Sequence, residues 1–164
     1  MNKRILAIAI VALLVLTAMP LVAQNGQTLN IGGLVPLILD LTITPDGIAQ
    51  DLPLVGNNDD EVVVVADITI STNNSTGFEL LAISQNGLLL INANADEIGY
   101  DIAFVPEGNT PTFGVIDAND VIFSETDPTL DTPITGTIQV QFDQSENHPA
   151  GYYSDQIALV LRTQ

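Results

Sequence analysis

From Gln24 onward, the chain consists of short runs in which apolar and polar residues alternate. Val, Ile, Thr, Phe and Tyr are frequent in these runs, and clusters of Gly, Asn, Asp and Pro lie between them. A period of two residues, bounded by turn-forming residues, predicts β-strands. The strands expected from this pattern cover residues 28–44, 62–71, 78–84, 88–91, 100–104, 121–123, 136–142 and 152–161.

Roughly seven to nine short strands at fairly regular spacing are typical of an antiparallel β-sandwich. No interval between the expected strands has the 3.6-residue period of a helix, so a βαβ arrangement is not expected. The sequence contains no internal repeat and no interdomain linker. It therefore predicts an all-β fold in a single domain that covers residues 24–164.

Two of the expected strands allow more detailed predictions. Along residues 62–71, the alternation places Asp67, Thr69 and Ser71 on the outer face. The apolar residues expected to face inward are Val62, Val64, Ala66, Ile68 and Ile70. The last strand is apolar at both parities, so we expect it to be central in its sheet or covered by another chain.

Residues 1–23 differ from the rest of the chain. Two basic residues precede an apolar run over residues 5–16, and Pro20 and Ala23 follow it. This order is typical of a secretory signal peptide that is cleaved near Ala23. The apolar run is shorter than the roughly 20 residues that a membrane-spanning helix needs. We therefore expect an exported protein whose mature chain has no membrane span, rather than a permanently anchored one.

The charge of the chain is strongly negative. Its 164 residues include 20 Asp and Glu but only three Lys and Arg, a formal net charge of −17. Lys3 and Arg4 belong to the expected signal peptide, so the mature chain keeps 20 acids and one base, Arg162, a charge of −19. This charge excludes nucleic acid as a partner and opposes binding to an anionic membrane. The lack of Cys and the single His exclude thiol chemistry and clustered His/Cys zinc sites.

The segment that opens the last expected strand, Pro149-Ala-Gly-Tyr-Tyr-Ser-Asp155, combines turn-forming and hydrogen-bonding residues. Pro and Gly favour a turn, and Asp155 is placed to accept hydrogen bonds from nearby backbone amides. A Tyr near the start of a late strand can anchor its hydroxyl on the backbone at a sandwich corner. Since Tyr152 and Tyr153 are adjacent on the chain, one of them is expected to be exposed.

This terminal segment resembles the last strand of bacterial spore-coat-U-like and fimbrial subunit domains. Residues 68–80, with Asn-Asn and Thr-Gly at a turn, are similar to a hairpin of secreted bacterial sandwich domains. Ile31-Gly-Gly-Leu-Val-Pro-Leu-Ile-Leu39 is similar to the N-terminal strand of such domains. The resemblance implies an immunoglobulin-like sandwich at the cell surface that serves as a building block of pili, coats or adhesive layers. Many subunits of this kind carry a disulfide, which this chain lacks.

Two roles are open for residues 28–39. Because this stretch is N-terminal, apolar and alternating, it is suited to complete the sheet of another subunit as a donated strand. The alternative is that it forms the first strand of its own sandwich. We favour the second role.

Catalytic residues are not expected. A Ser or Thr nucleophile needs a neighbouring base, and the only His, His148, lies in a turn where it reads as a solvated residue. The 20 acids offer many carboxylate pairs, but nothing marks a pair as buried or as facing another across a cleft. We therefore predict a protein without enzymatic activity.

Two acidic clusters are the candidate metal sites, because hard cations take oxygen ligands in loops. The candidate calcium ligands are Asp59, Asp60, Glu61, Asp117, Asn119 and Asp120. Neither cluster has the spacing of a helix–loop–helix calcium site. The alternative interpretation is that both are acidic loops that keep the protein soluble. No cofactor other than calcium is predicted.

Together these observations predict a non-catalytic structural or adhesive surface protein, similar to a pilus or coat subunit. We expect it in the periplasm, at the cell surface or outside the cell. Its expected partners are copies of itself, joined through strand edges, or other surface subunits. The alternative is an extracytoplasmic binding module for calcium or carbohydrate, although the absence of Trp weighs against a sugar-stacking platform.

Overall fold

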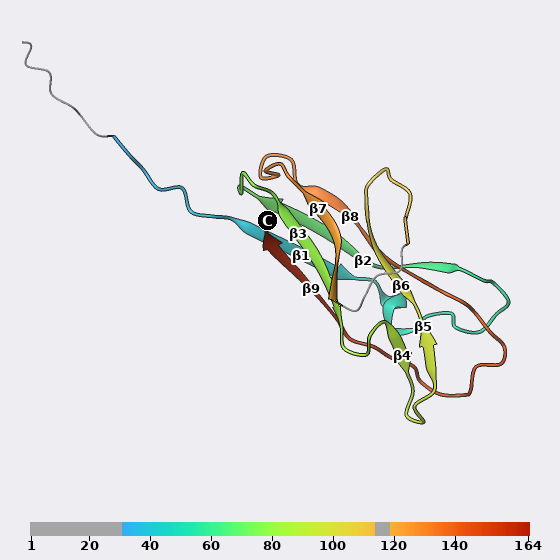
Figure 1. Cartoon of the computed structure of the whole chain (residues 1–164). Helices are drawn as coiled ribbons and strands as arrows, with labels where there is room; N and C mark the ends of the chain where they lie inside the picture. The colour runs from blue at the N-terminus through green and yellow to red at the C-terminus, as the bar shows by residue number, and fades with distance from the viewer. Residues whose placement is uncertain (1–30, 114–118) are drawn as a thin grey trace, which may run out of the picture. The chain divides into compact units, whose positions relative to one another are not determined.

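The computed structural model describes residues 31–113 and 119–164. The expected signal peptide, residues 1–23, lies outside the described residues, as does Asp117. The chain divides into two units, Met1–Val35 and Pro36–Gln164, and the second contains every helix and strand of the described residues (Figure 1). The fold given below is that of the second unit.

Two antiparallel sheets form this unit. The four-stranded sheet has the order β1-β2-β8-β6, with bounds β1 (Leu39–Pro45), β2 (Glu61–Thr72), β6 (Asp101–Pro106) and β8 (Ile134–Phe142). The three-stranded sheet has the order β7-β3-β9, with bounds β3 (Phe78–Ser84), β7 (Asn119–Glu125) and β9 (Ile157–Thr163). A hairpin of β4 (Leu89–Ile91) and β5 (Glu97–Gly99) and the short 3-10 helix η1 (Gly47–Gln50) complete the described elements.

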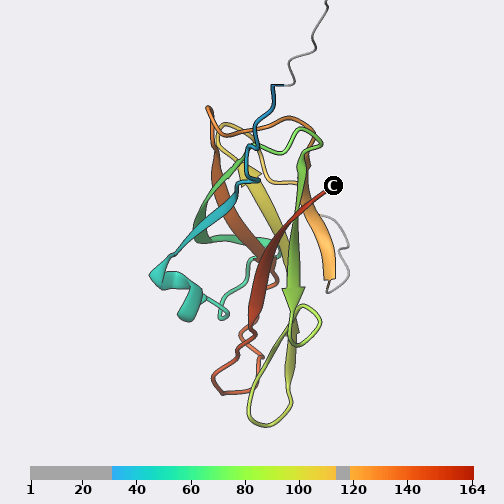
Figure 2. The same ribbon diagram turned by 90° about the vertical axis from the view of Figure 1, so that its left-hand side faces the viewer.

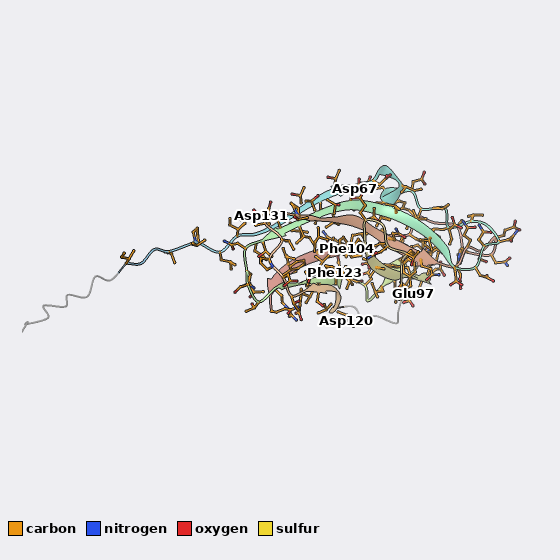
Figure 3. The ribbon with its side chains drawn as sticks, turned by 90° about the horizontal axis from the view of Figure 1, so that it is seen from above. Asp67, Glu97, Phe104, Asp120, Phe123 and Asp131 are labelled. Atoms are coloured by element: carbon orange, nitrogen blue, oxygen red, sulfur yellow. The ribbon has the colours of Figure 1, made fainter. Side chains whose placement is uncertain are left out.

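The core lies between the two sheets, which face one another in Figure 2. Ile68 and Ile70 of β2 and Phe78 and Leu80 of β3 are each at most 2% exposed. Phe123 of β7 packs across the gap, with its ring centroid 4.9 Å from that of Phe104 and 6.0 Å from that of Phe78. Figure 3 shows Phe104 and Phe123 close together inside the fold. Apolar contact between the sheets therefore holds the sandwich together in a chain without disulfides.

This architecture confirms the predicted all-β antiparallel sandwich, with nine strands among the described residues. The seven main strands divide four and three between the two sheets. The alternation pattern gave the bounds of β3 correctly, whereas β5 and η1 were not expected. In the part of the chain that the structure describes, no helix is long and apolar enough to cross a membrane.

The inward face of β2 differs from the prediction. Val62 and Val64 are 41% and 38% exposed, whereas Val63 and Ala66 are buried at 7% each. The pairing of β2 with β8 shifts register between Val64 and Ala66, as a β-bulge does. One extra residue on β2 reverses which parity faces the core. The prediction was therefore wrong for the two valines and is confirmed for Ala66, Ile68 and Ile70.

The first strand is shorter than predicted. β1 begins at Leu39 and pairs along its length with β2 of the same chain. Just before it, Asn73 holds the backbone of residues 36–38: its Nδ2 donates to Pro36 O at 2.8 Å, and its Oδ1 accepts from Ile38 N at 2.7 Å. Of residues 28–39, only Leu39 lies in β1, and residues 31–38 form no strand. The prediction that this stretch forms the first strand of its own sandwich is therefore wrong for residues 31–38, although residues 36–38 are held to the same sandwich by Asn73. Residues 28–30 lie outside the described residues.

The last strand is not central in its sheet. β9 pairs with β3 along its whole length and has no second partner among the described residues. It is therefore an edge strand, although its sequence is apolar at both parities. Ala158 and Val160 point outward and are exposed, while Ile157, Leu159 and Leu161 are half-buried against the core. Of the two arrangements expected from its sequence, the central position is excluded.

Candidate functional site

Asp155 joins three separate parts of the sandwich. Its Oδ2 accepts hydrogen bonds from Ser84 Oγ at 2.5 Å and from Tyr100 Oη at 2.6 Å. Its Oδ1 accepts from the backbone N–H of Asn86 at 3.1 Å and from that of Gln156 at 2.7 Å. The carboxylate thus connects the end of β3, the junction between β5 and β6, and the start of β9. The predicted bonds from Asp155 to backbone amides are confirmed.

The hydrogen-bonding capacity of the Asp155 carboxylate is filled by this network. An ionised carboxylate offers about four acceptor positions, and the four donors occupy them. The Ser84 hydroxyl is engaged both as a donor and as an acceptor, because it donates to Asp155 and accepts from Leu88 N at 2.7 Å. A nucleophilic serine would need a neighbouring base to accept its proton, and a carboxylate already saturated by donors is poorly suited to that role.

The Tyr100 hydroxyl lies in a buried, negatively charged environment. Burial raises the pKa of this phenol well above its ordinary value, and the hydrogen bond to the Asp155 carboxylate and the charge of that carboxylate raise the pKa further. All three effects oppose formation of a phenolate, since that group would be desolvated beside a like charge. Tyr100 therefore acts as a neutral hydrogen-bond donor.

Above pH 10, we expect the free energy of unfolding to fall by about 1 kcal/mol per pH unit because of Tyr100. The unfolded chain loses this phenolic proton near its ordinary pKa, whereas the folded chain retains it until a higher pH. Urea denaturation between pH 8 and 11.5 measures the slope. In Tyr100→Phe this part of the slope should vanish, although the variant starts from a lower stability. Equal slopes for the two proteins would contradict the assignment.

Tyr153 forms the predicted corner. Its hydroxyl donates to the carbonyl oxygen of Pro149, four residues upstream, at 2.9 Å. The ring is 9% exposed, whereas the neighbouring Tyr152 is 71% exposed. The expectation that one of the two adjacent tyrosines is exposed is therefore confirmed. Tyr153 fixes the path by which the chain enters β9, and Tyr152 is left at the surface.

A cavity of about 230 Å³ lies between the two sheets, beside the edge strands β1 and β9. Its walls are mainly aliphatic side chains from both sheets, and Tyr100 and Asp155 supply its polar groups. Every buried side-chain nitrogen or oxygen among the described residues has a hydrogen-bond partner. The cavity therefore offers apolar contact and carries no unsatisfied polar group.

The cavity continues into a second hollow of about 330 Å³. The two share Ala49, Leu52, Leu90 and Asp155 in their walls. The outer hollow also includes Val55 and Tyr152, which are 73% and 71% exposed. The outer hollow therefore adjoins the cavity at these residues and reaches the surface near Tyr152.

The first of the predicted calcium clusters lies just before and at the start of β2. Asp59 and Asp60 are exposed, and the Asp60 N–H donates to Asp143 Oδ1 at 3.0 Å. Glu61 Oε2 accepts from Asn58 Nδ2 at 3.0 Å. The loop is thus fixed to its neighbour by the Asp143 carboxylate, and the Glu61 carboxylate makes a bond within the loop.

The second predicted cluster lies at the start of β7. Asn119 is the first residue of that strand, and Asp120 is exposed with its Oδ1 accepting from Val121 N at 2.8 Å. Asp117 lies outside the described residues. Across residues 31–113 and 119–164, no three His, Cys, Asp or Glu side chains are close enough to hold a metal ion. Calcium binding stays a prediction.

His148 has a structural contact in its turn. Its Nε2 lies 3.4 Å from the carbonyl oxygen of Asp143, and its ring centroid lies 6.4 Å from that of Tyr153. In the described part of the chain, no Ser or Thr hydroxyl makes a hydrogen bond with His148. The structure brings Ser84 and Tyr100 together around Asp155. These two residues were not predicted from the sequence.

The described geometry thus consists of an unpaired apolar edge at β9, the Asp155 network at the start of that strand, and the adjoining cavity. None of these features identifies a known class of enzyme or binding protein. The likeness to spore-coat-U-like and fimbrial subunits stays an expectation from the sequence. No protein-family model matches this chain, and no curated protein matches it either.

Proposed function

We propose that this protein is an exported, non-catalytic structural subunit that assembles with copies of itself through strand edges at the cell surface. The observation that carries the proposal is the apolar edge strand β9, which has no partner on one side among the described residues. The signal-peptide pattern of residues 1–23 supports export.

β9 lacks the features that normally keep an edge strand from pairing. Natural edges are protected by charges, proline or bulges. β9 has no proline, and its only charged residue, Arg162, forms an ion pair with Glu79 of β3 at 2.6 Å. By contrast, each of the other edge strands of the two sheets carries an acid: Asp40 in β1, Asp101 in β6, and Asp120 and Glu125 in β7. β1 and β6 also end in a proline. β9 is therefore the edge best suited to pair with another chain.

The charge distribution also favours association through this edge. Twenty acids repel any second copy over most of its surface. Residues 157–161 of β9 carry no charge, and neither do residues 24–39. Contacts made through these segments avoid the strongest repulsion. Added salt screens the remaining repulsion, so association should increase with ionic strength.

Size-exclusion chromatography with light scattering tests the role of β9. Purified protein at high concentration and in salt should form oligomers. Val160→Lys places a charge on the exposed side of β9 and should return the protein to a monomer. Thr69→Lys is the matched control, because it adds the same charge to the outer face of the interior strand β2 and should leave the oligomers intact.

Two further results bear on the proposal. A protein that stays monomeric at every salt and protein concentration would contradict self-assembly. Deletion of residues 24–31 separates two modes of assembly: loss of the oligomers would indicate that the N-terminal stretch is donated to another subunit, and unchanged oligomers would indicate that β9 edges pair directly. Mass spectrometry of the exported protein checks cleavage near Ala23.

A further inference from the structure

The cavity beside β1 and β9 is large enough to hold a small ligand. Protein interiors are close-packed and contain few voids larger than a water molecule. This cavity has a volume of about 230 Å³ and receives side chains from both sheets. Two of its lining residues are alanines, Ala66 of β2 and Ala49 of η1, and their small size leaves the space open.

The walls define the part of a ligand that would enter. Ile43, Leu52, Ile138, Ile157 and Leu159 present aliphatic surface. Tyr100 and Asp155 are engaged with each other and with Ser84, so they have little capacity for a buried polar group. An engineered apolar cavity of about 150 Å³ holds benzene, so a cavity of this size accommodates about nine non-hydrogen atoms by proportion. A short alkyl chain fits both the volume and the chemistry.

The entrance defines the other end of the ligand. The outer hollow includes the carboxylate-bearing Asp51 and the exposed ring of Tyr152. Among residues 31–113 and 119–164, no Lys or Arg lines either the cavity or the hollow. The charge of the whole chain is −17, so an anionic head group would be repelled here and a cationic one attracted. An aromatic face beside the entrance also favours a cation.

We propose that this cavity binds the alkyl chain of a small amphiphile whose positively charged head lies at the entrance, near Asp51 and Tyr152. The site lies within a single sandwich, so its occupancy does not depend on the self-assembly proposed above.

Methyl NMR titration of the purified protein at a concentration where it is monomeric tests the inference. The probes are octylammonium, octanol and octanoate, which share one chain and differ in head-group charge. Octylammonium should bind most tightly and octanoate most weakly, and the methyl resonances of Ile43, Ile157 and Leu159 should shift. If octanoate or octanol bound as tightly as octylammonium, the assignment of a positively charged head group would be overturned. No shift with any probe would overturn the site.

Three variants locate the binding. Ala66→Leu fills the cavity and should abolish the shifts. If that variant does not fold, Ala49→Leu on the exposed helix η1 narrows the entrance and should weaken binding instead. Val64→Leu is the control, because it adds the same kind of bulk on the outer face of β2. Binding that survives both Ala66→Leu and Ala49→Leu would place the ligand elsewhere.

Two measurements address the head group and a competing occupant. Asp51→Asn should weaken the binding of octylammonium by about threefold and leave the binding of octanol unchanged, as expected for a solvent-exposed ion pair. Equal effects on both probes would contradict the role of Asp51. The competing occupant is residues 24–35 of a second copy, and a synthetic peptide of these residues is the probe. If the peptide shifts the same methyl resonances and is displaced by octanol, the occupant of the cavity is that segment and not an amphiphile.

Discussion

Replacing Asp155 by alanine is expected to lower the free energy of unfolding by about 3 kcal/mol, since each buried donor left without an acceptor costs roughly 1–3 kcal/mol. The substitution removes the acceptor of four hydrogen bonds at once. Ser84 and Tyr100 are only 8% and 7% exposed. Their hydroxyls would then lack the acceptor that Asp155 provides. Urea denaturation followed by circular dichroism measures the change.

Two variants calibrate this result. Asp155→Asn keeps the shape and one acceptor oxygen of the side chain, so it should cost less than alanine. Asp120→Ala removes an exposed carboxylate that accepts only from Val121 N, and its effect should stay within about 0.5 kcal/mol. If Asp155→Ala and Asp120→Ala proved equally mild, the network would not be a main support of the fold.

Gly77→Ala is expected to lower the free energy of unfolding by about 3 kcal/mol. The alanine would have to adopt a left-handed backbone conformation, and its Cβ would overlap the backbone at the end of β7. Gly77 lies in the turn between β2 and β3 with a φ of +84°. A Cβ at this position would overlap the carbonyl oxygen of Glu125 and lie 2.6 Å from Thr126 Cα. Both are backbone atoms, so relief requires the end of β7 to move away from β3.

Gly87→Ala separates the two contributions. Gly87 also has a positive φ, +75°, but its Cβ would meet nothing within 4 Å. This variant should lower the free energy of unfolding by about 1 kcal/mol, because only the left-handed backbone conformation is unfavourable there. The difference between the two variants therefore measures the close approach of the turn to β7. Equal costs would show that the sheet adjusts freely around Gly77.

Much of the fold could be predicted from local sequence, because strand periodicity and turn residues act over a few positions. The bounds of β3 follow from an alternating run between Gly77 and the turn at residues 85–87. The parity of Val62 and Val64 could not be predicted, because the bulge in β2 depends on its pairing with β8. The edge position of β9 escaped prediction for a related reason: apolar residues at both parities do not reveal whether a second strand is present.

The candidate site was only partly accessible to sequence analysis. The bonds from Asp155 to backbone amides and the Tyr153 corner follow from turn chemistry within a short segment. Ser84 and Tyr100 lie 71 and 55 residues from Asp155 along the chain, and each is an ordinary residue in its own strand context. Their convergence depends on the topology of two sheets. The cavity likewise arises from small residues on separate elements.

β9 follows the other eight strands of the described residues along the chain, and this order has a consequence for folding. The three-stranded sheet gains its last strand, and Ser84 and Tyr100 gain their common acceptor, only when residues 155–163 are present. A chain still being synthesised would therefore lack the closing strand and its carboxylate. We expect such a chain to remain loosely structured until residues 155–163 have been synthesised.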